Sequence, residues 1–485
     1  MRFFSFSGKS PALVAILPYI VLIMLPLSGC GGLSLETTTE KRLITAVPPE
    51  MQSDANSSQP SISADGHFVA FMSDATNLVI SPTNGAHNIF VKDTASGVTT
   101  RVSTDSNSVS SNKDSDYPAI SADGRFVAFE SLASNLVPGD TNSVCAAASG
   151  TSINCPDVFI KDTQTGETRR ISTDAAGAQG DRESKHPSIS SDGRFVAFNS
   201  GASNMVPGDA NGVSDIFVKD TRTGAVTLAS IGAAGERGDK YSDNPSISAD
   251  GRFVAFMSDA TNLVADDSND RTDVFLKDMQ TGALMRISTD ASGGQADDTS
   301  GQGSLAISAD GRHVAFDSVA TNLVAGDENG KRDIFLKDTQ TGAIILVSTN
   351  TAGAQGAEDS YKSVSLSADG SQISFSSDAP DLVPGDTNTT SGKTDIFIKD
   401  IKTGVISRIS TSTAGAQSNG KSELAAISAD GLFVAFASDA VNLILDDTNR
   451  KSDIFLKNIK SGVTTRISTS TSETMDEAET KTIGP

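Results

Sequence analysis

The residues of this chain with the clearest ligand-binding chemistry are Asp and Asn side chains in a recurring D-x-N-x-x-x-D pattern. Carboxylate and amide oxygens at alternate positions of a turn are the ligands that Ca²⁺ requires. The pattern recurs six times, twice with an insertion before its last Asp. Its members, our candidate calcium ligands, are Asp140, Asn142, Asp157, Asp209, Asn211, Asp215, Asp267, Asn269, Asp273, Asp327, Asn329, Asp333, Asp386, Asn388, Asp395, Asp447, Asn449 and Asp453.

A structural explanation of the same pattern stays open beside the calcium hypothesis. The segment lacks the Gly and the distal bidentate Glu of an EF-hand loop. Asx side chains also cap turns and can hold a loop onto the strand that follows it. One further copy has lost the pattern and carries Pro82, Asn84 and Asn88 instead. The sequence therefore leaves turn capping and cation binding as alternatives.

No catalytic constellation stands out. The chain has no G-x-S-x-G motif, so we expect no hydrolase domain of the prolyl-oligopeptidase type. No pair of its histidines has metal-ligand spacing, and we interpret each one as an ordinary substitution within a repeat: His67, His87, His186 and His313. Carboxylates that recur at repeated positions also argue against one catalytic copy. We therefore expect a protein that is not an enzyme.

The elements that carry these side chains are repeated seven times. The phrase S-A-D-G-R-F-V-A-F, or a close variant, recurs with its Asp at successive spacings of 58, 69, 58, 60, 59 and 61 residues. The seven Asp-Gly pairs begin at Asp65, Asp123, Asp192, Asp250, Asp310, Asp369 and Asp430. A fixed period of this length is typical of repeat architectures.

Each repeat contains four short β-rich runs. In the third copy we expect strands at 187–190, 195–198, 215–219 and 226–230, separated by turn residues. Asp-Gly and Thr-Gly turns favour hairpins, because Gly accepts a positive φ without steric cost. Four antiparallel strands repeated around an axis form a β-propeller blade. The sequence thus predicts an all-β fold, a seven-bladed β-propeller.

The aromatic residues fit this interpretation. Of 22 Phe, three lie in the N-terminal leader and the other 19 fall on three positions of the repeat, where His313 and Ile373 replace the expected Phe. We assign all 19 to the core between blades. Tyr is scarce and Trp is absent, so an aromatic platform for stacking sugars or bases is not expected.

The repeat resembles a known family. D-G-R-F-V-A-F, followed by D-I-F-V-K-D-T-Q-T-G-x-x-x-R-I-S, is similar to the WD-like repeats of TolB-type periplasmic propellers, over about residues 41–470. The chain departs from TolB in having seven repeats rather than six and no separate N-terminal α/β domain. Its repeats also carry an added S-x-A-x-N-L-V-x-G-D-x-N segment. The resemblance implies the fold more firmly than it implies TolB's partners.

The N-terminus reads as an export signal. Arg2 and Lys9 precede an apolar stretch that ends in L-S-G-C at Cys30, a pattern that resembles a bacterial lipobox. By that resemblance Cys30 is lipidated, residues 1–29 are the signal peptide and residues 30–40 are the tether. Gly31 in place of Asp favours the outer membrane. A plain transmembrane anchor, or cleavage elsewhere, is the alternative. Residues 471–485 are expected to form an acidic disordered tail.

The two remaining cysteines lie close together. Cys145 and Cys155 fall in an insertion of the second repeat, which explains the single 69-residue spacing. In an exported protein such a pair predicts a disulfide that fastens a long loop. Two free thiols are the alternative.

Charge and loop lengths bound the function. A net charge of −22 argues against binding nucleic acid. The first-to-second and third-to-fourth turns are short and share one face of the ring, whereas the remaining loops are long and share the other. Long loops on a rigid scaffold are usual binding sites. We therefore expect a monomeric, membrane-anchored scaffold that binds a protein or cell-envelope partner through its long-loop face.

Two other functions stay open. One is a propeller enzyme of the lactonase or lyase type with a metal in the central channel, which an asymmetric carboxylate or His at the axis would favour. The other is a Ca²⁺-stabilised surface adhesin.

For ring closure, residues 41–47 are similar to an outer strand. We expect them to pair within the seventh blade, beside or in place of 464–468.

Overall fold

The first two strands of every blade come from the conserved part of the repeat. The computed structural model describes residues 51–471 except 82, 84, 143, 147–151 and 388–392. The first strands are β1 (Ser57–Ile62), β5 (Ser115–Ile120), β11 (Ser184–Ile189), β15 (Ser242–Ile247), β19 (Ser300–Ile307), β23 (Ser360–Leu366) and β27 (Ser422–Ile427). The second strands are β2 (Phe68–Ser73), β6 (Phe126–Ser131), β12 (Phe195–Ser200), β16 (Phe253–Ser258), β20 (His313–Ser318), β24 (Gln372–Ser377) and β28 (Phe433–Ser438).

The third and fourth strands complete seven antiparallel sheets. The third strands are β3 (Asn88–Asp93), β9 (Asp157–Asp162), β13 (Asp215–Asp220), β17 (Asp273–Asp278), β21 (Asp333–Asp338), β25 (Asp395–Asp400) and β29 (Asp453–Asn458). The fourth strands are β4 (Thr99–Arg101), β10 (Thr168–Arg170), β14 (Val226–Leu228), β18 (Leu284–Arg286), β22 (Ile344–Leu346), β26 (Ile406–Arg408) and β30 (Thr464–Arg466). A small hairpin, β7 (Val144–Ala146) and β8 (Ser152–Asn154), occupies the insertion of the second repeat.

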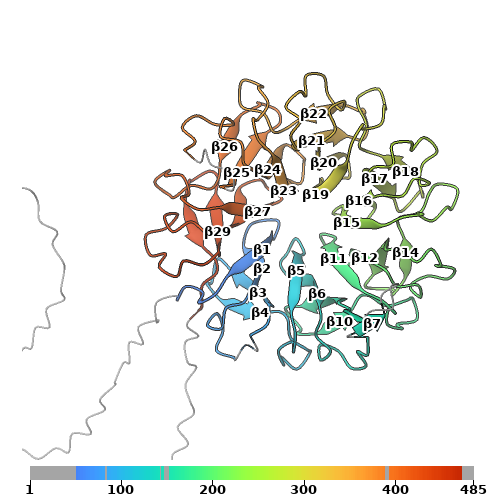
Figure 1. Ribbon diagram of the computed structural model, residues 1–485. Helices are drawn as coiled ribbons and strands as arrows, with labels where there is room; N and C mark the ends of the chain where they lie inside the picture. The colour runs from blue at the N-terminus through green and yellow to red at the C-terminus, as the bar shows by residue number, and fades with distance from the viewer. Residues whose placement is uncertain are drawn as a thin grey trace, which may run out of the picture. The chain divides into compact units, whose positions relative to one another are not determined.

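The predicted seven-bladed all-β propeller is confirmed. The blades form a ring with the first strands nearest the centre and the short fourth strands at the periphery (Figure 1). Each strand of the third blade begins within three residues of its predicted start. Across the described parts of residues 51–471, no helix is long and apolar enough to cross a membrane.

The Asp-Gly turn between first and second strands is built by its own side chains. In the first blade the Ser63 hydroxyl donates to Asp65 Oδ1 (2.8 Å) and accepts a hydrogen bond from Phe68 N (2.9 Å). Gly66 adopts φ +75°, a conformation that a residue with a Cβ enters only at a cost. Local chemistry in the S-A-D-G sequence therefore fixes the hairpin before any blade meets its neighbour.

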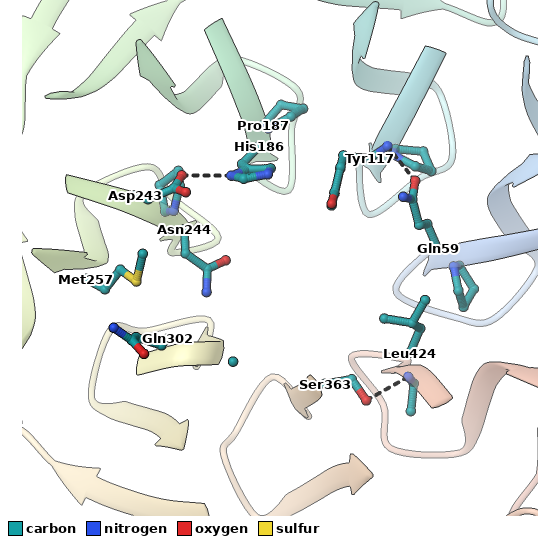
Figure 2. A pocket seen from close by; sticks show the side chains of 15 residues that line it. Gln59, Tyr117, His186, Pro187, Asp243, Asn244, Met257, Gln302, Ser363 and Leu424 are labelled. Atoms are coloured by element: carbon teal, nitrogen blue, oxygen red, sulfur yellow. Dashed lines mark hydrogen bonds and ion pairs between the residues drawn. The ribbon is translucent and has the colours of Figure 1, made fainter. Parts of the chain in front are cut away.

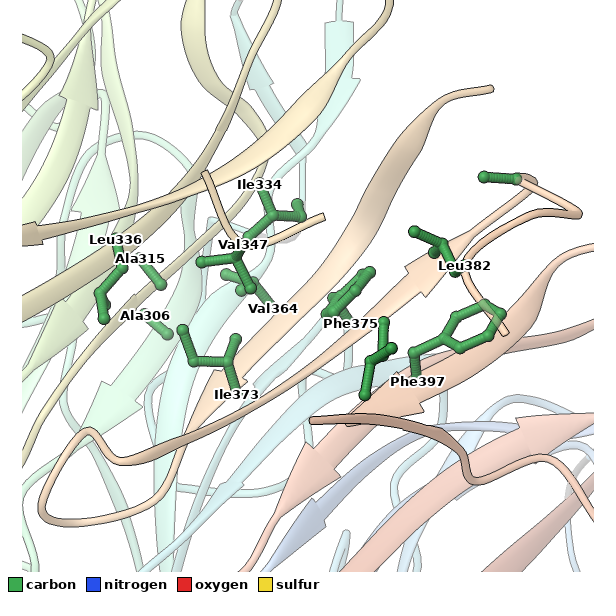
Figure 3. Packing of buried hydrophobic residues seen from close by; sticks show 12 residues of the cluster. Ala306, Ala315, Ile334, Leu336, Val347, Val364, Ile373, Phe375, Leu382 and Phe397 are labelled. Atoms are coloured by element: carbon green, nitrogen blue, oxygen red, sulfur yellow. The ribbon is translucent and has the colours of Figure 1, made fainter. Parts of the chain in front are cut away.

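Adjacent blades are joined by an apolar core and by their turns. Between the fifth and sixth blades, Ile334, Leu336 and Val347 pack against Phe375 and other side chains of the sixth blade (Figure 3). The turn glycine of each blade also packs against the first residue of the preceding blade's second strand. At Gly66 an added Cβ would lie 2.5 Å from the Phe433 ring, which belongs to the seventh blade. The same contact thus closes the ring.

Backbone hydrogen bonds between successive turns form a second closed circuit. Ala64 N donates to Ala122 O (3.0 Å), and equivalent bonds continue from turn to turn until Asp430 N donates to Ala64 O (3.3 Å). At the seam, Ser53 N donates to Ser468 O (3.0 Å) and Ser470 N to Met51 O (2.8 Å). The chain's first described residues therefore take the place that an inter-blade segment takes elsewhere.

Two expectations, on ring closure and on one core position, have separate outcomes. The fourth strand of the seventh blade is β30, supplied by the C-terminal chain, whereas residues 41–47, and with them the predicted pairing, lie outside the described residues. The assignment of Ile373 to a Phe position was wrong. Gln372 pairs with Asp400 as Phe68 pairs with Asp93, so Gln372 holds the Phe position and Ile373 the Val position.

Replacing Gly66 by Ala tests the ring-closing contact. The new Cβ would meet the Phe433 ring, and the positive φ would add backbone strain. We expect Gly66→Ala to cost about 2–4 kcal/mol of stability, the sum of left-handed strain and overpacking. The readout is the thermal midpoint of the purified protein followed by circular dichroism.

Gly462→Ala is the matched control. Gly462 has φ +73°, and no atom of the described residues lies within 4 Å of the place that an added Cβ would take, so only the strain of about 1–2 kcal/mol applies. Equal losses in the two variants would show that the contact with Phe433 contributes nothing to closure.

Candidate functional site

The side chains of the D-x-N-x-x-x-D segments lie beside Arg and Gln donors. In the fourth blade, Gln295 Nε2 donates to Asp267 Oδ1 (2.8 Å) and to Asp273 Oδ2 (3.1 Å). The Arg286 guanidinium lies 3.6 Å from both carboxylates. Asn269 Nδ2 donates to a main-chain carbonyl 2.8 Å away, which fastens the loop to the segment that leads into the next blade.

A guanidinium meets the first Asp of the pattern in four other blades. The pairs are Arg170–Asp140 (3.2 Å), Arg237–Asp209 (3.7 Å), Arg408–Asp386 (2.9 Å) and Arg466–Asp447 (3.7 Å). Among the described residues, no group of three or more His, Cys, Asp or Glu side chains could hold a metal ion. These contacts support the capping explanation, and calcium binding stays the untested alternative.

The fifth blade departs from this arrangement. Leu346 stands where four other blades with the motif have Arg, so Asp327 and Asp333 share only the donor Gln355 Nε2, at 2.7 and 2.8 Å, among the described side chains. Burial, together with the nearby charge of Asp327, raises the pKa of Asp333 to about 6, although hydrogen bonds oppose the rise. This loop therefore holds two carboxylates without a permanent counter-charge from the described residues.

Leu346→Arg should supply the missing positive charge. A guanidinium at this position would face Asp327 and Asp333 as Arg286 faces its own pair in the fourth blade. We expect a gain of about 1 kcal/mol, the scale of a charge-assisted hydrogen bond less its desolvation. The measurement is the thermal midpoint at pH 7, with chelator and with millimolar Ca²⁺.

Leu228→Arg serves as the control, because Arg237 already faces Asp209 in the third blade. We expect no gain in stability from Leu228→Arg. If the loops are turn caps, Ca²⁺ should also leave the thermal midpoint of the wild-type protein unchanged. A wild-type midpoint that rises with Ca²⁺, and no longer does so in Leu346→Arg, would show instead that the fifth loop holds the cation.

A second set of side chains converges on the axis of the ring. Each first strand bends at one residue of positive φ, where its register with the second strand shifts. These residues are Gln59 (φ 53°), Tyr117 (51°), His186 (50°), Asn244 (55°), Gly301 (81°), Lys362 (70°) and Leu424 (57°). Six are not Gly, and such strain of about 1–3 kcal/mol each persists where the surroundings impose it, often at functional sites.

The bent position is also where the repeats diverge. No two blades carry the same residue there, whereas the S-A-D-G turn is nearly invariant. The fifth residue of the second strand, which lies beside the bend, varies as well, with Met72, Glu130, Asn199, Met257, Asp317, Ser376 and Ala437. Residues that differ in every blade surround one opening, which makes that opening asymmetric.

The opening is a cavity of about 420 Å³ that we call the channel mouth. Its lining comes from all seven blades and is Gln59, Pro60, Tyr117, Pro118, His186, Pro187, Asp243, Asn244, Pro245, Met257, Gln302, Gly303, Ser363, Leu424 and Ala425. Figure 2 shows the labelled side chains arranged around the open centre. It lies towards the ends of the first and second strands that the long loops join.

Blades two to four supply an acid–base group to the mouth. His186 Nδ1 lies 2.7 Å from Asp243 Oδ1, and the Tyr241 hydroxyl donates to the other oxygen of Asp243. His186 N donates to Glu130 Oε2 (2.9 Å). The Tyr117 ring meets the His186 ring edge-on, with centroids 4.7 Å apart. Five residues from three successive blades thus form one wall.

The local charges stabilise an ion pair in this wall. Burial by itself would lower the pKa of His186, but the hydrogen bond and charge of Asp243, with the charge of Glu130, raise it above its usual value. Burial would raise the pKa of Asp243, yet the bonds from His186 and Tyr241 lower it. Burial raises the pKa of Glu130. The imidazolium–carboxylate form of the pair is therefore favoured.

His87 forms a separate link between the first two blades. Its Nδ1 lies 3.0 Å from Asp116 Oδ1 and its Nε2 lies 3.2 Å from Asp74 Oδ1, while its backbone N donates to Asp114 Oδ1 (3.0 Å). Both ring nitrogens are engaged, which gives this histidine a fastening role.

The fifth blade shapes its side of the mouth with a buried ion pair. Asp317 is fully buried and accepts hydrogen bonds from Gly303 N (2.9 Å), Ser304 N (2.7 Å) and Arg332 Nη1 (2.6 Å). These bonds hold the two extra residues of β19 in place. Gln302, on this segment, donates from Nε2 to Thr272 Oγ1 (2.9 Å).

Comparison with known proteins identifies the fold and leaves the function open. No protein-family model and no curated protein matches the sequence. A solved prolyl endopeptidase structure is 11% identical over 89% of this chain and 53% of its own, with a TM-score of 0.51. TolB from Acinetobacter baumannii is 16% identical over 67% of this chain and 62% of its own, with a TM-score of 0.36. The chain thus spans less than two thirds of either protein.

An oligogalacturonate lyase from Vibrio parahaemolyticus is 14% identical over 84% of this chain and 91% of its own, with a TM-score of 0.47. Of these three structures, only the prolyl endopeptidase reaches a TM-score above 0.5, and at 11% identity that similarity shows a shared fold alone. The seven four-stranded sheets of the chain itself confirm the fold expected from the resemblance to TolB-type repeats. No conclusion about shared chemistry follows from these scores.

The channel mouth was missed at the sequence level. His186 was interpreted as an ordinary substitution, and Asp243 and Tyr117 were not considered. The signal was present as departures from the repeat: the residues before and at the bend differ in nearly every copy. Their convergence becomes visible only when 57 or more residues of chain are folded into separate blades.

Other predicted site residues have mixed outcomes. Cys155 is disulfide-bonded, but the side chain of Cys145 lies outside the described residues, so their pairing stays a prediction. Cys30 and Asn388 also lie outside the described residues. His67 contacts its own turn at Asp65 (3.2 Å), and His313 packs against Gly370 where other blades have Phe.

Stability should rise as the pH falls from 7 to 5. Burial raises the folded-state pKa of Asp157, Asp209 and Asp333 to about 6, so ionising them at pH 7 disfavours the folded state. Protonation below pH 6 removes this penalty, on the order of 1 kcal/mol per group. His186, with a raised pKa, adds stability below its unfolded value that is lost at higher pH. Urea unfolding at pH 5, 6 and 7 measures the effect.

The opposite trend should set in under strong acid. Hydrogen bonds from Arg125 lower the pKa of Asp162 to about 2, and its contribution is lost as the pH falls from about 4 through 2. Leu346→Arg should reduce the gain between pH 7 and 5, because it would lower the pKa of Asp333. A free energy of unfolding that falls steadily from pH 7 to 5 would contradict the raised pKa values of these buried carboxylates.

Proposed function

We propose that this protein is an envelope binding protein that receives a segment of a protein partner through its long-loop face, with the channel mouth as the recognition site. The observation that carries the proposal is the concentration of blade-to-blade differences at side chains that line the mouth. A repeated scaffold with one asymmetric opening is suited to recognition, because specificity requires residues that the repeat does not dictate.

The chemistry of the lining fits a peptide segment. Gln59, Asn244 and Gln302 bring carboxamides to the mouth, and a carboxamide both donates and accepts hydrogen bonds, as a peptide main chain does. Gln59 Oε1 already accepts from Tyr117 N (2.7 Å), which fixes its orientation. Prolines and Leu424 supply apolar surface for side chains. The lipid tether at Cys30, expected from the lipobox resemblance, would keep the propeller near its membrane.

An enzyme of the lyase or lactonase type is the second candidate. The observation in its favour is the pairing of His186 with Asp243 at the axis, because a carboxylate on Nδ1 orients an imidazole for proton transfer through Nε2. In that role His186 would remove or return a proton on a substrate in the mouth. Loss of turnover in His186→Gln, with ligand binding retained, would favour this candidate.

Photo-crosslinking from opposite faces tests the binding proposal. A photoreactive amino acid at Leu424, in the mouth, should give one discrete adduct in native envelopes, whereas the same group at Leu432, beside the Asp430-Gly431 turn, should give none. Leu424 already adopts a positive φ, so Leu424→Trp should fill the mouth while leaving the backbone in place.

We expect Leu424→Trp to weaken capture of the crosslinked partner about tenfold or more, equivalent to about 1.4 kcal/mol. Leu432→Trp, an exposed position on the other face, is the control and should leave capture unchanged. Adducts that form only from residue 432, or capture that survives Leu424→Trp, would refute recognition through the mouth.

A further inference from the structure

One wall of the channel mouth concentrates negative charge around two rings. Asp243 contacts His186, Glu130 accepts from the His186 backbone, and Asp116 immediately precedes Tyr117. These carboxylates come from the second and fourth blades. His186 faces Asp243, His87 faces Asp116, and Lys185 lies near Glu130, so these carboxylates are offset in part. The charges that act on the Tyr117 ring are nevertheless negative, those of Glu130, Asp116 and Asp243.

The pKa values of Tyr117 and His186 are both shifted in this wall. Burial raises the pKa of Tyr117, and the charges of Glu130, Asp116 and Asp243 raise it further. The pKa of His186 is raised in spite of its burial. Both shifts have the sign expected where a positive charge is favoured and a negative charge is not.

The cations of the opposite wall are already paired with carboxylates. The ammonium groups of Lys362, the bent residue of the sixth blade, and of Lys421 contact Glu423 Oε2 at 2.8 and 2.7 Å, and the charge of Asp378 also acts on Lys362. The lining there is Ser363, Leu424 and Ala425. A ligand entering the mouth therefore meets carboxylates on one side and neutral groups on the other.

The mouth also has surface for the rest of a basic side chain. Tyr117 is 45% exposed, so part of its ring is open to a guanidinium or ammonium group. Pro118, Pro187 and Met257 can cover an aliphatic stem. A bare metal ion would use none of these apolar contacts.

From this combination we infer that the channel mouth binds a basic side chain, an arginine or lysine, presented by an extended peptide segment of the partner. The cationic head lies between Tyr117 and the carboxylate wall, and the carboxamides of Asn244 and Gln59 receive the peptide main chain. The net charge of −22 attracts such a segment from a distance. This inference rests on the proposed function and adds the chemical class of what is recognised.

The test compares an arginine with its neutral analogue citrulline. Isothermal titration of the full chain uses the capped peptides Gly-Gly-Arg-Gly-Gly and Gly-Gly-citrulline-Gly-Gly at low salt. We expect the arginine peptide to bind about tenfold more tightly or better, with the difference shrinking as salt is added. Equal affinities would overturn the inference.

Variants locate the effect. Asp243→Asn and Tyr117→Leu should each weaken the arginine peptide about tenfold and leave the citrulline peptide little changed. Glu328→Gln is the matched control, because Glu328 is an exposed carboxylate of a long loop that is not among the lining residues of the mouth. A loss in Glu328→Gln as large as in Asp243→Asn would also overturn the inference. Glu130→Gln is the second variant should Asp243→Asn lower the thermal midpoint.

Leu424→Trp separates this inference from the proposed function. If both peptides bind equally and both are lost in Leu424→Trp, the mouth recognises peptide without a charge preference, and only the basic-group inference falls. If the arginine peptide binds and survives Leu424→Trp, its site lies outside the mouth, which overturns the inference too. Arginine selectivity that is lost in Leu424→Trp supports both.

Discussion

The ring depends on one contact made seven times, in which the glycine of each Asp-Gly turn packs on the first residue of the second strand of the preceding blade. Gly124 stands against Phe68 as Gly66 stands against Phe433, and the backbone circuit through the turns closes at Ala64. Since every blade has to fit two neighbours, a change at a contact position must be matched in the next blade. This explains why turn and core positions are nearly identical in all copies. Freedom to vary is left to side chains that no neighbouring blade has to accommodate.

At the axis of the ring, this freedom to vary allows the side chains to form a binding site. Seven first strands converge there, so a single position of the repeat contributes seven side chains to one opening. The bent backbone at this position is strained in six blades, yet it recurs in all of them and so belongs to the scaffold. The side chains it presents are not constrained in this way. Tyr117, His186 and Asn244 can therefore differ completely although the backbone beneath them is the same.

The sequence was sufficient for the fold because the decisive contacts are local or repeated. The S-A-D-G turn is closed by its own Ser and Asp, and a period near 60 residues implies copies of one unit. The sites were less predictable, because their partners are remote. The spacing of Asp267 and Asp273 indicated calcium, but Arg286 and Gln295, which meet them, follow in later segments. His186 and Asp243 belong to different blades, and only the register of the ring brings them to 2.7 Å. At β24 a one-residue error in alignment was enough to exchange Gln372 with Ile373.

The two sets of buried carboxylates differ in how completely they are neutralised. In most long loops the counter-charge is a guanidinium, which stays protonated at any physiological pH, so those carboxylates place little further demand on a ligand. At the mouth the counter-charges are imidazoles, which titrate: His186 faces Asp243, and His87 faces Asp116. The repeated Asp residues are the most obvious candidate ligands in the sequence, yet most of them are paired with guanidinium groups of the scaffold. The negative charge that no permanently charged side chain compensates lies at the asymmetric opening. A basic side chain of a partner would compensate it most simply.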